Sequence, residues 1–174
     1  MDFQLRPWRD TDADSLMRYA NNSAIARNLR DVFPHPYTLD DARQYLRLCR
    51  EADNSRELCY AVETAGEAVG SVGVFLKTDV NRKCAELGYW LGEPFWGKGV
   101  GTEAVRRICS EAFRKFDIER IYAEPFARNT GSRRVLEKAG FTLEGVMRNS
   151  VYKNGVVEDA CLYALLKDEI QYIE

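Results

Sequence analysis

Histidine is scarce in this sequence, and its cysteines lack metal-binding spacing. His35 is the one histidine among 174 residues. The five cysteines form no CxxC pair: Cys49, Cys59, Cys84, Cys109 and Cys161. Zinc sites need clustered cysteine and histidine ligands, so we expect no metal. The opening MDFQLRPWRD is charged from its second residue, which is not typical of a signal peptide. We therefore expect free thiols and a cytoplasmic protein.

Long apolar runs and a marked charge excess are absent as well. No run reaches the roughly 18–20 residues of a membrane span. The formal net charge is −2, so neither a membrane nor a nucleic acid is an expected partner. Apolar residues make up 45% of the chain and charged residues 30%, which is ordinary for a globular protein. We predict one domain over residues 1–174, without linkers or repeats.

Hydrophobic periodicity predicts alternating strands and helices. An opening strand covers residues 3–8, and helices follow over about 10–21, 24–29 and 38–52. Asp10 or Thr11 can cap the first helix, and Thr38 with Asp41 forms a near capping box at the start of the third. Three strands come next, in LCYAVET, AVGSVGVFLKT and CAELGYWL. The first two are predicted to form a hairpin with a tight turn near Gly66.

A helix to about Phe116, the strand RIYAEPF and a helix in NTGSRRVLEKAGF precede a hairpin turning at Asn154-Gly155. Asn129 is the expected cap of the second of these helices, and Gly140 its expected end. This order predicts a mixed α/β sheet with helices on both faces. Residues 87–126 read as strand, glycine-rich loop, helix and strand, which predicts a parallel crossover.

The helix before Phe116 begins with an unusual run of glycines. Gly97, Gly99 and Gly101 stand in five residues of YWLGEPFWGKGVGTEAV. Each glycine costs roughly 0.5–1 kcal/mol against alanine inside a helix, so another requirement must favour bare backbone here. Backbone N–H groups at a helix start bind anions, and glycine lets a phosphate approach them.

Several phosphate loops compete for this segment. A P-loop needs Ser or Thr after Gly-Lys, but Gly99 follows Lys98. A dinucleotide loop needs a third glycine where Thr102 stands. A pyrophosphate loop of the form [QR]xxGx[GA] matches at Gly99 and Gly101, with Trp96 in place of Gln or Arg. A connection without a ligand is the remaining alternative.

Three blocks stand in order along the chain: AELGYWLGEPFWGKGVGTEA, NTGSRRVLEKAGF and GVMRNSVYKNGVVEDACLYALL. They resemble the GCN5-related N-acetyltransferase (GNAT) superfamily, closest to its bacterial Rim-type ribosomal-protein acetyltransferases, and the likeness covers essentially the whole chain. The resemblance implies a single-domain acetyl-CoA-binding N-acyltransferase fold. Its sheet would be mixed, mostly antiparallel and of about seven strands, with helices on both faces.

The resemblance also implies acetyl-CoA as co-substrate and a set of residues that bind it. The backbone from Gly97 to Thr102 would hold the pyrophosphate, and Leu91 N–H would face the thioester oxygen. The implied cofactor-binding residues are Tyr89, Trp90, Leu91, Trp96, Gly97, Lys98, Gly99, Val100, Gly101, Thr102, Asn129 and Ser132.

The catalytic groups are less clear. Many family members carry a tyrosine as general acid where this chain has Leu136, so Ser132 is the implied acid, as in Rim-type enzymes. Ser132 bonding only the backbone near its helix start is the alternative. Glu86 is the predicted base, with an exposed or salt-bridged strand glutamate as the alternative. Glu144 and Glu158 are weaker candidates, and Val151 stands where a Rim-type glutamate is expected.

The acceptor is predicted from the cost of making an amine neutral. At pH 7 this costs roughly 4.6 kcal/mol for lysine and about 1 kcal/mol for an α-amine. Without a convincing base, a protein or peptide N-terminus is the better acceptor. The nominated substrate-binding residues are Phe33, His35, Tyr37 and Tyr152.

Two other functions stay open. One is acetylation of a small amine, such as a polyamine, an amino acid or an aminoglycoside-like drug. The other is a non-catalytic acyl-CoA sensor. The expected partners are acetyl-CoA and an amine acceptor, including a ribosomal or other protein N-terminus, and a homodimer is also allowed.

Overall fold

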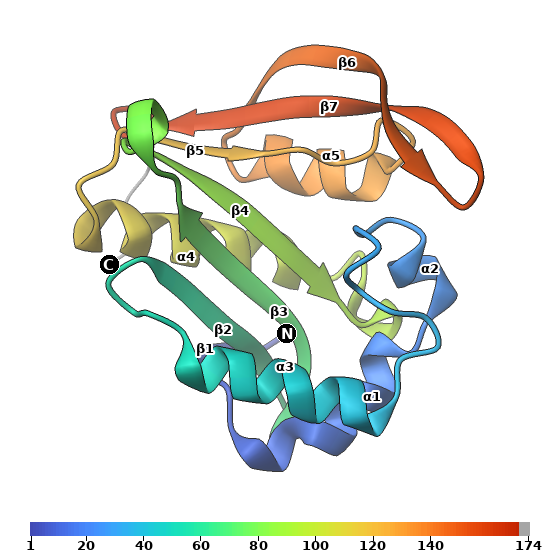
Figure 1. Ribbon diagram of the computed structural model, residues 1–174. Coiled ribbons are helices and arrows are strands. Elements are labelled where there is room, and N and C mark those ends of the chain that lie inside the picture. The colour runs from blue at the N-terminus through green and yellow to red at the C-terminus, as the bar shows by residue number, and fades with distance from the viewer. Residues whose placement is uncertain (171–174) are drawn as a thin grey trace. The chain divides into compact units, whose positions relative to one another are not determined.

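The computed structural model describes residues 1–170, whose helices and strands are labelled in Figure 1. The strands are β1 (Gln4–Pro7), β2 (Glu57–Thr64), β3 (Glu67–Leu76), β4 (Cys84–Leu91), β5 (Arg120–Ala123), β6 (Thr142–Lys153) and β7 (Val156–Leu166). The α-helices are α1 (Ala13–Ala20), α2 (Ser23–Ala26), α3 (Leu39–Glu51), α4 (Val100–Lys115) and α5 (Thr130–Lys138). Short 3-10 turns are η1 (Asp10–Asp12), η2 (Asp79–Asn81) and η3 (Glu93–Phe95).

The strands form one seven-stranded mixed sheet in the order β1-β2-β3-β4-β5-β7-β6. The pairs β1–β2, β5–β7 and β6–β7 are antiparallel. β4 and β5 are parallel, with Glu86 opposite Tyr122, which confirms the predicted crossover from strand through glycine loop and helix to strand. The predicted mixed α/β sheet is confirmed.

Local signals explain most element ends. Thr38 and Asp41 form the predicted capping box of α3, with Thr38 N donating to Asp41 Oδ2 at 2.7 Å. Both predicted hairpins turn on two residues with positive φ, Ala65-Gly66 and Asn154-Gly155. The first long helix differs from the prediction, because residues 10–12 form the turn η1 and α1 begins only at Ala13.

The chain divides into two compact units. The first comprises Met1–Gly73 and Tyr89–Gly101, and the second Val74–Gly88 and the residues from Thr102 onward. The predicted single domain over 1–174 stays a prediction, and its last four residues lie outside the described ones. Among residues 1–170, none of the helices has the length and apolarity needed to cross a bilayer.

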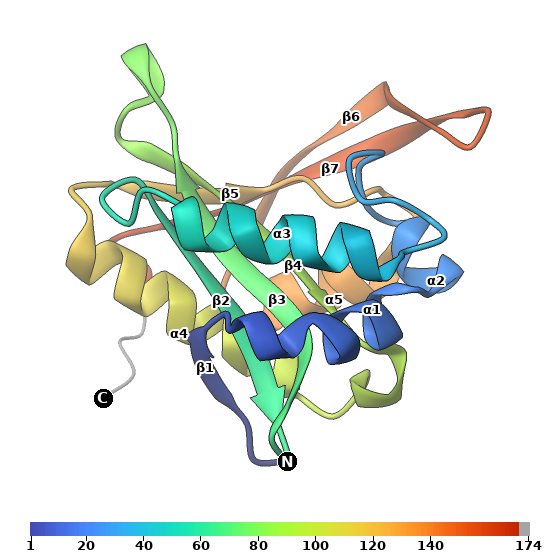
Figure 2. The same ribbon diagram turned by 60° about the horizontal axis from the view of Figure 1, so that its bottom comes forward.

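In the first unit, α1 and α3 lie side by side (Figure 2). Their apolar stripes meet in a buried cluster of Leu16, Ala20, Tyr37, Ala42 and Leu46. Trp8, Phe33, Tyr45 and Trp90 pack against this cluster. The cluster therefore fixes the helices on the strands of this unit.

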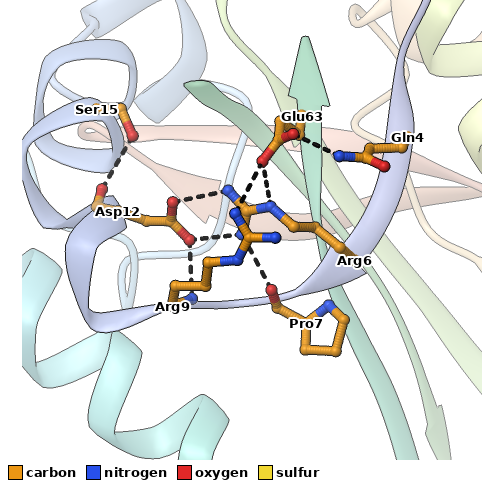
Figure 3. A network of polar contacts seen from close by, with 7 residues as sticks. All are labelled: Gln4, Arg6, Pro7, Arg9, Asp12, Ser15 and Glu63. Carbon is orange, nitrogen blue, oxygen red and sulfur yellow. Dashed lines mark hydrogen bonds and ion pairs between the residues drawn. The ribbon is translucent and has the colours of Figure 1, made fainter. Parts of the chain in front are cut away.

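Buried charges tie β1, η1 and β2 together in the same unit (Figure 3). Arg6 makes a bidentate pair with Asp12 at 2.7 and 2.8 Å and also binds Glu63. Burial favours the neutral acid, but hydrogen bonds from Arg6 and the Arg9 backbone N–H outweigh it and lower the pKa of Asp12. Asp12 stands at the N-cap position of α1, but its carboxylate accepts from Arg6 and from Arg9 N instead of from the helix. Asp12 N also donates to Arg9 O, so residues 10–12 close as the turn η1 and α1 begins after it.

The second unit is built around β5 and the long β6–β7 hairpin, which run side by side in Figure 1. Its most buried side chains include Ile108, Ile121, Leu136, Tyr163 and Leu165. Asn129 caps α5, and Gly140, at φ +101°, ends that helix as predicted.

Candidate functional site

The end of β4 lies unusually close to β3. Gly92 N donates to Val69 O at 2.7 Å. A Cβ atom on Gly70 would stand 2.5 Å from Trp90 O and 3.0 Å from Leu91 Cα. Only glycine fits at position 70, so β3 fixes the backbone of residues 90–92. Sequence reasoning did not single out Gly70, although a lone glycine inside a strand pattern is the signal for such an approach.

Trp96 connects this strand end to the glycine loop. Its indole Nε1 donates to Leu91 O at 2.6 Å, while 44% of its surface stays exposed. The bond spans the turn η3 and holds the start of the loop against the end of β4. A tryptophan in the place of the usual Gln or Arg thus has a positioning contact within the loop.

The loop itself is open. Gly97 and Gly99 have φ values of +71° and +81°, and an added Cβ would meet no atom within 4 Å at either position. α4 begins at Val100, whose side chain is buried. Two of the three glycines therefore lie before the helix and serve a left-handed backbone, and only Gly101 lies inside it.

This geometry fits an anionic ligand. The first N–H groups of α4 lack partners within the helix and carry the positive end of its dipole. Gly97, Lys98 and Gly99 are exposed beside them. Lys98 places its ammonium 5.9 Å from the centre of the Phe95 ring, which packs edge-on against Tyr19. The loop thus offers bare backbone, a helix start and a cation to a phosphate group.

The strand residues before the loop are half-buried. Tyr89, Trp90 and Leu91 belong to the same unit as the loop. Trp90 packs edge-on against Phe33, with ring centres 5.8 Å apart. The structure thus gathers the predicted residues from Tyr89 to Gly101 within one unit.

The remaining predicted cofactor and catalytic residues belong to the second unit. Asn129 Oδ1 accepts a hydrogen bond from Ser132 N at 3.1 Å and caps α5. Ser132 is half-buried at this helix start, and Leu136, in the place of the family tyrosine, is fully buried in the core. The roles of Thr102, Asn129 and Ser132 toward a ligand stay predictions.

Each candidate base is paired with a cation. Glu86 Oε2 lies 3.3 Å from Lys77 Nζ. Tyr122, and then Glu86, raise the pKa of Lys77. Arg120 binds Glu144 through a 2.6 Å hydrogen bond and lowers the pKa of that carboxyl group. Glu158 pairs with Arg128. The assignment of Glu86 as base stays a prediction, but its ion pair matches the alternative stated for it.

The nominated acceptor residues lie in different surroundings. Phe33 and Tyr37 pack with ring centres 5.0 Å apart, and burial raises the pKa of Tyr37. Tyr37 is only 5% exposed and belongs to the core of the first unit, whereas His35 is exposed. Tyr152 is 70% exposed on β6 of the second unit. Their contacts with an acceptor stay predictions.

An open pocket of about 390 Å³ borders η3 in the first unit. It is lined by Arg18, Tyr19, Asn21, Asn22, Glu93 and Pro94. Several of its polar groups already have partners: Tyr19 donates to Glu67 and Asn22 to Glu93, each at 2.7 Å. The glycine loop remains the better candidate for ligand binding.

Comparison with known proteins decides the family. The sequence model of the acetyltransferase (GNAT) domain matches residues 2–142. The chain belongs to the GNAT acetyltransferase family. It is 34% identical to the "Probable N-acetyltransferase YjcK" of Bacillus subtilis (strain 168), over 95% of this chain and 94% of that protein. It is therefore an acyltransferase of the N-acetyltransferase kind.

The Rim-type resemblance is also confirmed. The chain is 28% identical to the ribosomal-protein-serine acetyltransferase of Escherichia coli (strain K12), over 59% of this chain and 56% of that protein. Mycobacterium smegmatis RimJ, solved with CoA-disulfide, is 26% identical with a TM-score of 0.82. That match covers 97% of this chain and 83% of RimJ.

Proposed function

We propose that this N-acetyltransferase transfers the acetyl group of acetyl-CoA to the α-amine at the N-terminus of a protein or peptide. The observation that supports acetyl-CoA as the acetyl donor is the open, left-handed backbone at Gly97 and Gly99, directly before α4. RimJ, a relative of the same fold, binds a form of CoA. A pyrophosphate is the part of acetyl-CoA that suits a helix start.

The end of β4 supplies the position of the thioester in this proposal. Leu91 N–H faces the thioester oxygen, and the bond from Trp96 to Leu91 O fixes the next peptide unit, between residues 91 and 92. A fixed donor stabilises the negative charge that this oxygen gains during attack. Asn129 and Ser132 are the proposed contacts to pantetheine and sulfur.

The chemistry is a direct attack. The neutral amine nitrogen bonds to the thioester carbon, the carbon–sulfur bond breaks, and the thiolate leaves with the electron pair. A thiol has a pKa of about 8.5, so its thiolate leaves readily and a weak acid such as Ser132 suffices. The amine loses its surplus proton to solvent or to the departing sulfur.

The paired glutamates support an α-amine acceptor. Glu86, Glu144 and Glu158 each form an ion pair with a cation, and the hydrogen bond from Arg120 lowers the pKa of Glu144. An α-amine with a pKa of about 7.8 is partly neutral at pH 7 and needs little help. A ribosomal-protein acetyltransferase among the relatives also favours a protein acceptor.

The decisive experiment follows thiol release from acetyl-CoA with a panel of N-terminal peptides, lysine peptides, polyamines, amino acids and aminoglycosides. We expect turnover with N-terminal peptides, fastest near or above pH 8. Faster turnover with a lysine peptide or a small amine would overturn the acceptor. Tight acetyl-CoA binding without thiol release on any amine would instead indicate a sensor.

A pair of matched variants tests the donor loop. Asparagine tolerates left-handed backbone, so Gly99→Asn keeps the loop conformation and adds a side chain where the phosphate would lie. Gly155→Asn makes the same change in the β6–β7 turn, at φ +82° and equally open. We expect Gly99→Asn to weaken acetyl-CoA binding at least tenfold and Gly155→Asn to leave it unchanged. Equal binding by both variants would contradict the loop assignment.

A further inference from the structure

Two cysteines of the first unit lie almost within bonding reach of one another. Cys49 is in the last turns of α3, and Cys59 is the third residue of β2. Their Sγ atoms are 3.9 Å apart, and both side chains are half-buried. A disulfide bond is about 2.0 Å long, so the two sulfurs need to approach by only about 2 Å.

Hydroxyl groups surround one of the two sulfurs. The Tyr45 hydroxyl lies 3.3 Å from Cys59 Sγ and 2.9 Å from Ser71 Oγ. Ser71 Oγ itself is 3.9 Å from Cys59 Sγ. Tyr45 is held by edge-on packing with Trp8, with ring centres 5.5 Å apart. These donors converge on Cys59, and hydrogen bonds to a thiolate favour its charged form.

The two thiols consequently differ. The hydrogen bond from Cys49, together with those from Tyr45 and Ser71, outweighs burial and lowers the pKa of Cys59. The same contact with Cys59, followed by burial, raises the pKa of Cys49. Cys59 is the sulfur suited to attack, and Cys49 is the protonated thiol beside it.

We propose that Cys49 and Cys59 are a redox modification site, which a hydroperoxide converts to a disulfide joining α3 to β2. The proposal concerns the first unit alone and does not depend on the acceptor or donor of the acetyl transfer.

The reaction balances in two steps. The Cys59 thiol gives up its proton, and the thiolate attacks one oxygen of hydrogen peroxide. The O–O bond breaks, and the second oxygen leaves as hydroxide, which takes up a proton in place of the one that Cys59 lost and becomes water. Cys59 is now a sulfenic acid. The Cys49 sulfur attacks the Cys59 sulfur, the S–O bond breaks, and the hydroxyl group leaves with the Cys49 proton as a second water. Two thiols are oxidised, and one peroxide is reduced.

The experiment treats the native protein with hydrogen peroxide, alkylates the remaining thiols and digests it with trypsin without a reductant. Cleavage after Arg47, Arg50, Arg56 and Lys77 places the two cysteines on peptides 48–50 and 57–77. We expect these two peptides joined by a disulfide, and separate again after dithiothreitol. Both cysteines alkylated at a peroxide dose that oxidises Cys84 would overturn the proposal.

Variants resolve the two roles. In Cys49→Ser the sulfenic acid at Cys59 has no neighbouring Cys49 thiol to react with. We therefore expect the sulfenic acid to persist and to be trapped by a cyclic diketone. In Cys59→Ser we expect oxidation of Cys49 to slow roughly tenfold or more, because the reactive sulfur is gone. Cys84→Ser is the control and should leave the linked peptide unchanged. Equally fast oxidation of Cys49 in Cys59→Ser would contradict the assigned order, and circular dichroism verifies that each variant is folded.

Discussion

Gly70 and the pair Gly97 and Gly99 lie in the same unit and need glycine for opposite reasons. At Gly70 a Cβ atom would stand 2.5 Å from Trp90 O, although the backbone is ordinary strand. At Gly97 and Gly99 the space is open, but φ is +71° and +81°. The first position is restricted by its neighbours and the second by its own backbone, so one residue type reports two different constraints.

The largest loss of stability is expected from adding a side chain at position 70. In Gly70→Ala the new methyl group meets backbone atoms that cannot rotate away, and overpacking of this kind costs about 3 kcal/mol. We expect the melting temperature to fall by roughly 6–12 °C, measured by circular dichroism. Gly88→Ala is the matched control in a neighbouring strand, because its Cβ would lie at an ordinary 3.7 Å from a Phe75 side-chain atom. Equal melting temperatures of the two variants would contradict the claim that neighbouring backbone excludes a side chain at position 70.

A smaller loss of stability is expected from a substitution at Gly97, where the surrounding space is open. Gly97→Ala places alanine in left-handed backbone, which costs roughly 1–2 kcal/mol. Gly66→Ala, in the β2–β3 turn, has φ +82° and the same open space, so it should lose a similar amount. Thermal denaturation compares the two. Only Gly97→Ala should also weaken acetyl-CoA binding. If both variants lost acetyl-CoA binding equally, the loss would reflect backbone strain in general and not a contact of the loop with the ligand.

Stability measured as a function of pH tests the buried ion pairs of the first unit, and so contrasts its interior with the open loop. Asp12 and Glu63 have folded-state pKa values below the ordinary 3.8 and 4.5, so the unfolded chain binds more protons as the pH falls. Their stabilisation is fully present above about pH 5 and is lost as the pH falls through their folded pKa values. The slope is at most about 1.4 kcal/mol per pH unit for each group.

Matched variants isolate the buried acid in this titration. Asp12→Asn should flatten the dependence of the melting temperature on pH between 5 and 3. Asp10→Asn is the control, since Asp10 pairs with Arg50 in an exposed bridge. An unchanged acid profile in Asp12→Asn would show that other groups carry the pH dependence.

The smallest effect is expected at Trp96, whose hydrogen bond to Leu91 O links the strand end beside Gly70 to the glycine loop. Trp96→Phe keeps the aromatic ring and removes the bond to Leu91 O, worth about 0.5–1 kcal/mol. We expect the KM for acetyl-CoA to rise two- to fivefold with little change in melting temperature. Steady-state kinetics measures this, and an unchanged KM would mean that β3 alone fixes the strand end.

Sequence patterns predicted the fold well where the signal is local. The capping box of Thr38 and Asp41, the Asn154-Gly155 turn and the strand CAELGYWL lie in the structure where they were predicted. The start of α1 was misplaced, because residues 10–12 form the 3-10 turn η1, closed by the hydrogen bonds between Arg9 and Asp12. Polar residues at a helix start do not distinguish the first turn of an α-helix from a 3-10 turn that precedes it.

The sequence by itself determined the order of strands and helices, the family and the position of the glycine loop, because spacing, turn residues and caps act between neighbours in the chain. Only the tertiary structure decided that Gly70 is crowded, that Trp96 binds Leu91 and that Lys77 pairs with Glu86. It also brought Cys49 within 3.9 Å of Cys59. These distances depend on strand pairing and helix packing, which no local pattern of residues encodes.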